Sequence, residues 1–251
     1  LERWRGRVHA HINLFWSHQD VDCESISVRR ENLYAAAFDR ARVNACLSVY
    51  VDSSRVADAL DQRFGFKPPI WPMIGVSNPR LVARVRETAS GSGGRKRIFC
   101  PANGQIAKGF DLFCSAITRF QKAYPDLDVE FVVRDYLRGS AEENEKLQEL
   151  VEELRSRPGV RLLPGALDEE RYLSEYAAAD VVVLPYRRSS FATRTSGALV
   201  DALSFDGWVL VTQDTWLSDA AAGLPGTATF VDGDADDLAA RMIELARLPR
   251  P

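Results

Sequence analysis

From residue 95 onward, short apolar runs alternate with longer segments of helical spacing, and this alternation limits the fold more than any other feature. The apolar runs cover residues 97–100, 129–133, 160–163, 181–184, 208–212 and 227–231. Residues 181–184 read Val-Val-Val-Leu, which is typical of a strand buried on both faces of a sheet. Strands that alternate with helices form a parallel sheet with right-handed crossovers. The sequence therefore predicts an α/β fold over residues 96–248, with a doubly wound parallel sheet of about six strands.

The segments between these runs have the apolar periodicity of helices. They cover residues 108–123, 141–157 and 168–178, the run that starts at Ala198, and a last segment from Asp234 or Asp236 to Leu248. Asp168 stands where the N-cap of its helix is expected. In sheets of this type, ligands bind beyond the carboxyl ends of the strands, where the strand order reverses. We therefore expect the functional residues in the loops that follow the strands.

The N-terminal part of the chain is less regular but contains one clear strand and helix. Residues 46–51 have the composition of a buried strand, and Asp52 or Ser53 is placed to cap a helix that ends at Gly65. Residues 32–43 have helical spacing, and residues 69–74 are expected to form a short strand.

A Ser/Gly-rich run at residues 90–94 has the composition of a flexible linker. We therefore expect two domains: a partial or abridged N-terminal α/β portion over residues 1–90, and a C-terminal domain over residues 95–251.

Composition excludes several classes of protein. The net charge of the 251 residues is −3, which does not favour a nucleic-acid binder. No apolar stretch approaches the roughly 20 residues that span a bilayer, and the opening residues do not resemble a secretory signal peptide. The cysteines show no Cys-x-x-Cys spacing, so we expect a reduced, cytoplasmic protein with buried thiols: Cys23, Cys46, Cys100 and Cys114.

The three histidines, His9, His11 and His18, all lie near the start of the chain. His9 and His11 would share one face of a strand and could bind a metal. No cysteine or carboxylate follows at a ligand spacing, and two neutral imidazoles alone bind weakly. We therefore expect a structural role for these residues and no metal cofactor.

The loop after residues 181–184 has the features of an anion site. Three arginines (Arg187, Arg188 and Arg194) crowd it with no acid between them in the sequence. Like charges repel unless an anion lies among them. Thr195 or Ser196 can cap the next helix, whose first backbone N–H groups have no partner inside the helix. The arrangement predicts a phosphate on this helix start.

Lys108 is the second candidate. It follows the first strand of the C-terminal domain and precedes Gly109 at a helix start. A helix start is an unfavourable place for a cation unless the cation serves a ligand. The loop is not a Walker A motif, because no Gly-x4-Gly-Lys-Ser/Thr is present.

Taken together, these motifs resemble a family. Asp-Val-Val-Val-Leu-Pro-Tyr (180–186), Arg-Thr-Ser-Gly-x-Leu-Val-Asp-Ala-Leu (194–203) and Val-Leu-Val-Thr (209–212) are similar to the nucleotide-sugar-binding half of GT-B glycosyltransferases. Within that fold, the pattern is most similar to the large retaining, metal-independent group that includes bacterial polysaccharide glycosyltransferases. The resemblance covers roughly residues 96–248.

The resemblance implies a nucleotide-sugar donor and a hexosyltransferase activity. It assigns Lys108 and Arg194 to the donor's diphosphate, as catalytic counter-charges without a metal. Gly165 and Ala166 correspond to the turn that reads the base, and Asp201 to the carboxylate that bonds the ribose. The donor-binding residues would be Gly104, Gln105, Lys108, Gly165, Ala166, Tyr186, Arg194, Thr195, Ser196, Gly197 and Asp201.

The chain departs from the family pattern at three positions. Gln105 stands near the place where the family often has an arginine. The family's second glutamate is Asp201, which is one methylene shorter, and its first would fall at Thr193, which has no carboxylate.

These departures leave alternatives open. The chain is expected to transfer sugar to a glycan or lipid-linked acceptor in polysaccharide biosynthesis, with possible peripheral membrane contact and no nucleic-acid partner. A non-catalytic sugar-nucleotide-binding or assembly module of the same fold is the alternative. A GT-B epimerase would need further acids and a longer first domain.

Overall fold

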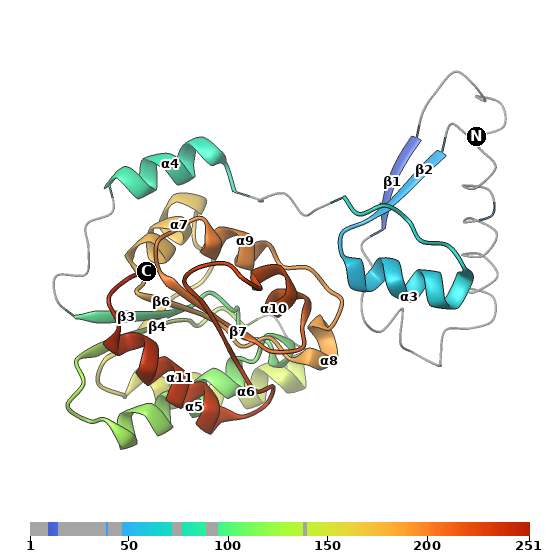
Figure 1. The fold of residues 1–251 in the computed structure, drawn as a ribbon. Coiled ribbons are helices and arrows are strands. Elements are labelled where there is room, and N and C mark those ends of the chain that lie inside the picture. Colours follow the sequence, from blue (N-terminus) through green and yellow to red (C-terminus); the bar gives the residue numbers. More distant parts are fainter. Residues whose placement is uncertain (1–9, 15–38, 40–46, 72–76, 89–94, 138–139) are drawn as a thin grey trace. The chain divides into compact units, whose positions relative to one another are not determined.

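The computed structural model describes residues 10–14, 39, 47–71, 77–88, 95–137 and 140–251, with the element labels of Figure 1. The chain divides into two compact units. The first comprises Leu1–Met73 with Ser189–Thr195, and the second comprises Ile74–Arg188 with Ser196–Pro251. The chain therefore passes between the units three times, and residues 189–195 belong to the first unit although both of their flanks belong to the second.

The N-terminal part of the first unit forms two parallel strands and the helix α3 among its described residues. Strand β1 (Ala10–Leu14) pairs with β2 (Leu47–Val51), and helix α3 (Ser54–Phe64) follows. Ser53 caps α3 by accepting a hydrogen bond from the backbone N–H of Val56, and Gly65 ends the helix with a φ of 59°. Both predicted ends of this helix are confirmed.

A small apolar cluster joins β2 to α3. The fully or nearly buried residues are Val49, Val51, Val56, Ala57 and Leu60. Of the strand predicted at residues 69–74, Ile70 forms a single parallel bridge with Val51. Residues 72–76 lie outside the described residues, as do the linker at 90–94 and nearly all of the helix predicted at 32–43.

The second unit is built on one sheet of six parallel strands, which confirms the predicted fold class. The strands are β3 (Lys96–Cys100), β4 (Val129–Arg134), β5 (Val160–Leu163), β6 (Val181–Leu184), β7 (Trp208–Thr212) and β8 (Thr227–Phe230). Their order across the sheet is β5-β4-β3-β6-β7-β8. The order reverses between β3 and β6, so the carboxyl ends of these two strands form the topological switch point.

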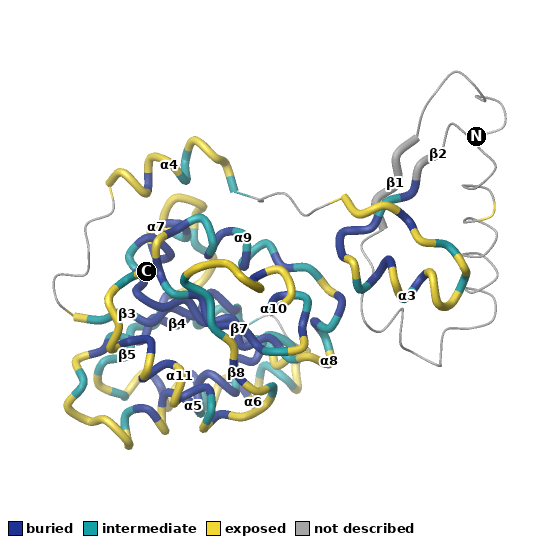
Figure 2. Tube along the Cα trace, in the orientation of Figure 1, coloured by how far each residue is buried: buried dark blue, intermediate teal, exposed yellow. Residues whose placement is uncertain are grey.

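Burial explains why these strands form the centre of the unit. All four residues of β6 are buried, as its apolar sequence predicts. The strands lie in the buried interior, and exposed residues lie on the outer helices and loops (Figure 2). The β-branched residues that pack well on a pleated surface therefore sit where both faces of the sheet are covered.

Helices cover both faces of the sheet (Figure 1). One face carries α5 (Phe110–Ala123), α6 (Ala141–Arg155) and α11 (Ala235–Arg247). The other carries α7 (Glu169–Ala178), α9 (Gly197–Leu203) and α10 (Trp216–Ala221). Asp168 and Asp234 cap α7 and α11 through their carboxylates, as predicted. The four-residue helix α8 (Arg188–Phe191) and α10 were not predicted.

The helix predicted from residue 108 begins later. Residues Ile106–Lys108 form a 3-10 turn (η2), Gly109 has a φ of 67°, and α5 starts at Phe110. A left-handed glycine cannot continue a helix, so it separates Lys108 from α5.

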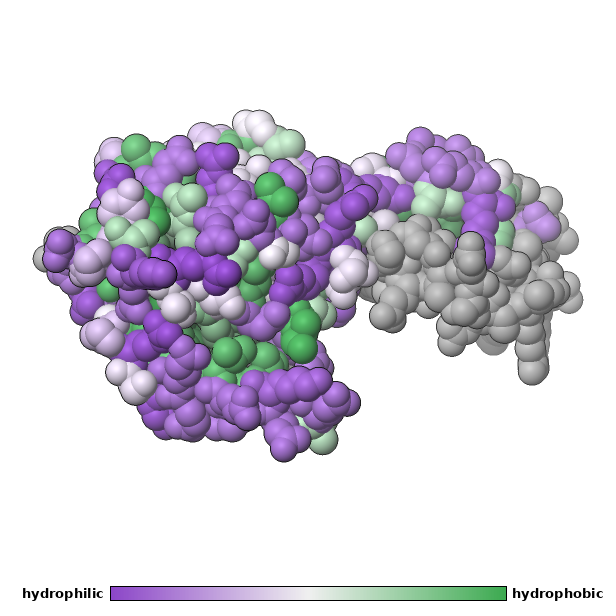
Figure 3. Space-filling model, turned by 90° about the horizontal axis from the view of Figure 1, so that it is seen from below, coloured by the Kyte–Doolittle hydropathy of each residue, from purple (hydrophilic) through white to green (hydrophobic). Residues whose placement is uncertain are grey.

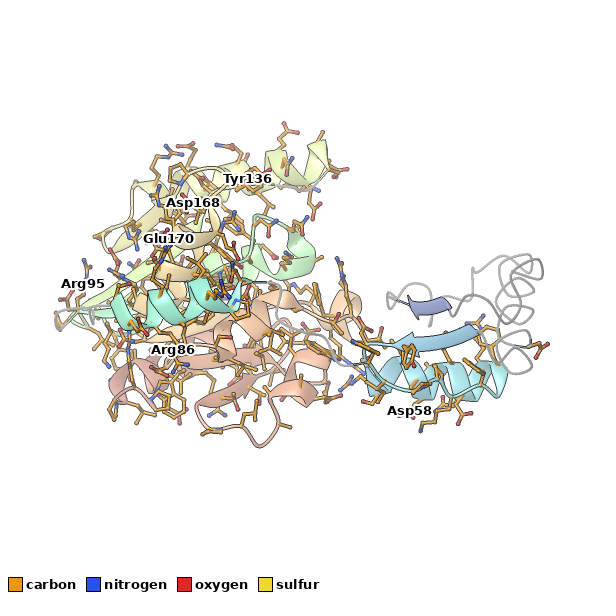
Figure 4. The ribbon with its side chains drawn as sticks, turned by 90° about the horizontal axis from the view of Figure 1, so that it is seen from above. Asp58, Arg86, Arg95, Tyr136, Asp168 and Glu170 are labelled. Atoms are coloured by element: carbon orange, nitrogen blue, oxygen red, sulfur yellow. The ribbon has the colours of Figure 1, made fainter. Side chains whose placement is uncertain are left out.

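Helix α4 (Pro79–Thr88) packs on α7 and belongs to the second unit. Arg84 pairs with Glu170 at 2.7 Å, and Arg86 pairs with Asp206 at 2.9 Å. In the view from above, Glu170 and Arg86 lie on either side of α4 (Figure 4). The compact units divide between Met73 and Ile74, whereas the domain boundary that we predicted at residues 90–94 stays a prediction.

The opposite side of the second unit, seen from below, is mainly hydrophilic, with apolar residues gathered in places between the charged ones (Figure 3). An open apolar groove between α5 and α11 lies among Ala123, Tyr124, Ala239 and Ile243.

Within the described part of the chain, no helix is long and apolar enough to cross a membrane.

Candidate nucleotide site

Lys108 lies at the topological switch point. Its Nζ donates to Asn103 Oδ1 at 2.9 Å and lies 5.7 Å from the centre of the Tyr186 ring. Tyr186 follows β6 and is 1% exposed, whereas Lys108 is half-buried. The ammonium is therefore held by an amide oxygen and an aromatic face, which attract it without neutralising its charge.

The two loops at the switch point are locked together. The backbone N–H of Arg187 donates to the carbonyl of Ala107 at 3.0 Å. A Cβ on Gly109 would lie 1.8 Å from the carbonyl oxygen of Pro185, so only glycine fits there. This close approach, together with the left-handed φ, accounts for the Lys-Gly pair that the sequence singled out.

Gly104 and Gln105 shape the same loop without adding charge. The N–H of Gly104 donates to the carbonyl of Tyr136 at 3.0 Å, and a Cβ on Gly104 would lie 2.1 Å from Leu137 Cδ2. The carbonyl of Gln105 accepts from the backbone N–H groups of Lys108 and Phe110. Gln105 therefore holds the turn that presents Lys108.

Ser196 is the N-cap residue of α9, but its side chain makes no capping hydrogen bond. The Thr195 hydroxyl donates to Asp52 Oδ2 at 2.7 Å instead. The N-cap position was therefore predicted correctly, but the prediction that a side-chain hydroxyl caps the helix is wrong. Because neither hydroxyl caps α9, neither accepts a hydrogen bond from the first backbone N–H groups of this helix, which can therefore donate to a ligand.

The arginine-rich loop has an acid nearby that the sequence did not predict. Arg187 Nη2 lies 2.6 Å from Asp111 Oδ2 of α5. Arg194 is exposed and lies 5.1 Å over the ring of Phe191. The prediction of three uncompensated arginines is thus wrong, because a carboxylate from a distant element pairs with one of them.

The predicted site residues divide between the two units. Arg194 and Thr195 belong to the first unit, and Lys108, Ser196 and Gly197 belong to the second.

A pocket of about 460 Å³ in the second unit contains Asp201. Its lining comprises Ser77, Arg134, Leu167, Glu169, Tyr172 and Asp201. Two carboxylates, a guanidinium, a hydroxyl and an aromatic ring therefore face one volume. Pockets of roughly 300–1,000 Å³ hold small molecules, and this mixture of groups suits a nucleoside, which has hydroxyls, polar edges and a flat face.

The turn that was expected to read the base lies directly before this pocket. Gly165 and Ala166 are exposed and precede Leu167, which is part of the lining. Gly165 has a φ of 65°, and its N–H donates to Asp135 Oδ1 at 3.1 Å.

The surroundings of Asp201 in the pocket raise the pKa of its carboxyl above the ordinary value. Its side chain makes one hydrogen bond in which Ser77 Oγ donates to Oδ1 at 2.8 Å. Burial raises the pKa of Asp201, the Ser77 hydrogen bond lowers it, and the nearby charge of Glu169 raises it again, with a net upward shift. Burial likewise raises the pKa of Tyr172 to about 12, so this phenol keeps its proton.

Of the six residues that line this pocket, sequence reasoning singled out Asp201 and missed the other five, which include Arg134 and Ser77. Arg134 ends β4, and its guanidinium lies 5.5 Å over the ring of Tyr172 and 5.9 Å over that of Tyr136. Ser77 reaches Asp201 from a segment that is 124 positions away. The place of Arg134 at the carboxyl end of a strand was a signal that could have been used, whereas nothing in the sequence indicated Ser77.

The remaining candidates are the cysteines and the histidines. Cys100 and Cys114 are free and buried, and burial raises the pKa of the Cys100 thiol to about 12. The side chains of His9, His11 and His18, like Cys23 and Cys46, lie outside the described residues. Within the described residues, no group of three or more histidines, cysteines, aspartates or glutamates is placed to hold a metal ion.

Solved structures with this architecture are glycosyltransferases. The UDP-forming α,α-trehalose-phosphate synthase from Burkholderia xenovorans aligns with a TM-score of 0.70 and 14% identity, over 99% of this chain and 63% of that one. Sucrose-phosphate synthase from Thermosynechococcus elongatus gives 0.65 and 18%, over 94% and 58%. Anabaena HepE, solved with UDP and glucose, gives 0.63 and 16%, over 95% and 62%.

The chain thus spans about three fifths of the length of each of these structures. A comparison with the sequences of curated proteins found no match. A model of the family described as "Glycosyl transferases group 1" matches residues 95–247, which is more than half of the chain and nearly all of the six-stranded sheet with its helices. The chain therefore belongs to the group 1 glycosyltransferases.

Proposed function

We propose that this chain is the donor-binding part, or a short form, of a nucleotide-sugar-dependent glycosyltransferase. The observation that carries the proposal is the pair of features at the carboxyl ends of the strands. Lys108 lies at the switch point, and the pocket around Asp201 lies beyond the ends of β4 and β5. A nucleoside in the pocket and a diphosphate near Lys108 use both features with one ligand.

The chemistry requires a stabilised leaving group. When the bond between the sugar's anomeric carbon and the β-phosphate oxygen breaks, negative charge develops on the nucleoside diphosphate. Lys108 and the uncapped N–H groups of α9 stabilise that charge, and Arg194, two residues before the N-cap of α9, is proposed as the second cation. Lys108 is positioned before the reaction by Asn103 and Tyr186, so little reorganisation is needed.

The finer features of the reaction follow from the family resemblance. The proposed reaction retains the anomeric configuration by front-face attack, needs no metal, and transfers a hexose to a glycan or lipid-linked acceptor in polysaccharide biosynthesis in the cytoplasm. The structure of Anabaena HepE in complex with UDP and glucose supports a nucleotide-sugar donor.

Binding of the diphosphate is tested by calorimetric titration of Lys108→Ala and Arg194→Ala with the diphosphate and with the unphosphorylated nucleoside. UDP, GDP, ADP and TDP are first screened by thermal shift, because a ligand that binds only the folded state raises its stability. A charge-assisted contact to phosphate contributes roughly 1.5–3 kcal/mol, so each variant should bind the diphosphate about 10- to 150-fold more weakly. Nucleoside affinity should not change.

The matched control is Lys122→Ala, which removes an exposed lysine from the last turn of α5. It should leave both affinities unchanged. Equal losses for diphosphate and nucleoside in the Lys108 variant would show that the residue acts on the fold, and wild-type diphosphate affinity would place the anion elsewhere.

A non-catalytic sugar-nucleotide-binding or assembly module is the second candidate. One observation favours it: Thr193 is 7% exposed and supplies no charge where the family has its first carboxylate. Slow hydrolysis of a UDP- or GDP-sugar panel, followed by chromatography, separates the two. Turnover that is lost in Lys108→Ala supports the enzyme, and binding without turnover supports the module.

A further inference from the structure

Two hydrogen bonds fix residues 193–195 to the corner between β2 and α3, within the first unit. Ser53 Oγ donates to the backbone carbonyl of Thr193 at 3.3 Å, and Thr195 Oγ1 donates to Asp52 Oδ2 at 2.7 Å. The bonded residues are 140 and 143 positions apart in the sequence. The two anchors lie on either side of Arg194, which is exposed.

The carboxylate that makes the second anchor is buried. Asp52 is 5% exposed, and its other oxygen, Oδ1, has no hydrogen-bond partner among the described residues. Burying a carboxylate with one oxygen unsatisfied costs free energy. Burial raises the pKa of Asp52, and the Thr195 hydrogen bond opposes this shift. A small apolar residue would fill the position at lower cost, so the carboxylate serves something other than stability.

The two anchors affect both the cap of α9 and the position of Arg194. With its hydroxyl bonded to Asp52, Thr195 does not cap α9, which starts two residues later. With both neighbours held, the backbone of Arg194 has a fixed position, and its guanidinium rests over Phe191, 5.1 Å from the ring centre. A cation with a fixed backbone loses less conformational entropy when it binds an anion.

We propose that Asp52 is a positioning residue, which acts through Thr195 to hold Arg194 in place for the donor's diphosphate. The inference rests on the proposed function, because it assumes that Arg194 binds that diphosphate. It adds that Asp52 contributes to the affinity for the diphosphate through its hydrogen bond from Thr195, and not through a contact of its own with the nucleotide.

The test compares four variants by calorimetric titration with UDP, or with whichever of GDP, ADP and TDP gives the largest thermal shift. Asp52→Ala removes the acceptor, and Thr195→Val removes the donor at nearly constant volume. Asp52→Asn keeps an acceptor oxygen. Thr193→Val is the control, because the Thr193 hydroxyl is buried with no partner among the described residues, and its anchor to Ser53 uses only the backbone carbonyl.

Asp52→Ala and Thr195→Val should weaken diphosphate binding by at least about threefold, and by no more than Arg194→Ala does, because coupled neighbours interact by about 0.5–3 kcal/mol. Asp52→Asn should retain most of the affinity, and Thr193→Val should match the wild type. Nucleoside binding should not change in any variant, which separates this effect from a general loss of folding.

A double-mutant cycle shows whether the effect passes through Arg194. In an Arg194→Ala background, Asp52→Ala should have less than about a twofold effect. An equal effect in both backgrounds would overturn the proposal, as would equal losses in Asp52→Asn and Asp52→Ala.

The outcomes also separate this proposal from the one that it rests on. Wild-type affinity in Arg194→Ala contradicts the assignment of Arg194 to the diphosphate, and with it both proposals. A loss in Arg194→Ala with none in Asp52→Ala and Thr195→Val overturns only the positioning role of Asp52.

Discussion

Two buried aspartates of the second unit, Asp180 and Asp201, have opposite surroundings. Asp180 directly precedes β6, at the amino end of the sheet, and is 5% exposed. Its carboxylate accepts from the Arg97 backbone N–H at 2.9 Å and from Arg250 Nε at 3.1 Å, with Lys96 Nζ at 3.6 Å. Burial favours its neutral form, but these donors together hold the pKa of Asp180 below its ordinary value.

Asp201 lines the pocket at the carboxyl ends of the strands and is 6% exposed. Ser77 donates one neutral hydrogen bond to it, and among the described residues no lysine or arginine forms an ion pair with it. Its pKa is raised by burial. At nearly equal burial, Asp180 has cationic partners and a lowered pKa, whereas Asp201 has a neutral hydrogen-bond donor and a raised pKa.

The largest expected effect is on the stability conferred by Asp180. Asp180→Ala leaves Arg250 and the Arg97 N–H without their acceptor, so the free energy of unfolding should fall by about 3 kcal/mol. Chemical denaturation measures this loss. The matched control is Asp206→Ala, which breaks an ion pair whose aspartate side chain is 68% exposed and should cost less than about 1 kcal/mol. Similar losses in the two variants would contradict the contrast between the buried and exposed pairs.

The next effect concerns ligand binding. Asp201→Asn removes the charge that would accept the ribose hydroxyls, so affinity should fall by about tenfold for nucleoside and nucleoside diphosphate alike. Stability at pH 7 should not fall, because the buried charge is removed. Calorimetric titration gives both affinities. A loss restricted to the diphosphate would place Asp201 near the phosphates and not near the ribose.

A smaller effect is expected for the hydroxyl that bonds Asp201. Ser77→Ala should lower the free energy of unfolding by about 1 kcal/mol, because it leaves a buried carboxylate with one hydrogen bond fewer. The same substitution in an Asp201→Ala background should cost less, and a denaturation cycle of the four proteins checks this. Additive losses would mean that Ser77 acts elsewhere.

The smallest effect is a difference in pH dependence. The lowered pKa of Asp180 contributes stability that is present above the ordinary value of 3.8 and is lost as the pH falls. The raised pKa of Asp201 has the opposite sign: stability is greatest below 3.8 and decreases as the pH rises toward the folded-state pKa. Relative to wild type, Asp180→Asn should lose stability as the pH rises toward 3.8 from below, and Asp201→Asn should gain stability as the pH rises above 3.8. Each slope is limited to about 1.4 kcal/mol per pH unit. If both variants gained stability relative to wild type as the pH rises, or both lost it, the contrast between Asp180 and Asp201 would be wrong.

What the sequence predicted depended on local pattern. The apolar residues of β6, the N-caps Asp168 and Asp234, and the glycine at the end of α3 follow from neighbours a few positions away, and all are confirmed. Lys108 was singled out by its own loop in the same way, and the structure places it at the switch point.

What the sequence did not predict depends on pairs that only the fold brings together. The carboxylate of Asp111 beside Arg187 is 76 positions away, and Ser77 is 124 positions from Asp201. The hydroxyl of Thr195 was expected to cap α9 because capping is a local rule, but a buried carboxylate 143 positions away accepts its hydrogen bond. In the case of Thr195, a long-range hydrogen bond to a buried carboxylate overrides the local preference for capping.

The three chain crossings between the units have a practical consequence for dissecting the molecule. A fragment that starts at Ile74 would carry residues 189–195 without Asp52 and Ser53, their partners in the first unit. The fragment would keep the whole six-stranded sheet, yet residues 193–195 would lose both anchors, and Phe191, which is 2% exposed in the intact chain, would be left without the rest of its unit. Truncation between the two units therefore preserves the sheet but removes Asp52 and Ser53, the hydrogen-bond partners of residues 193–195.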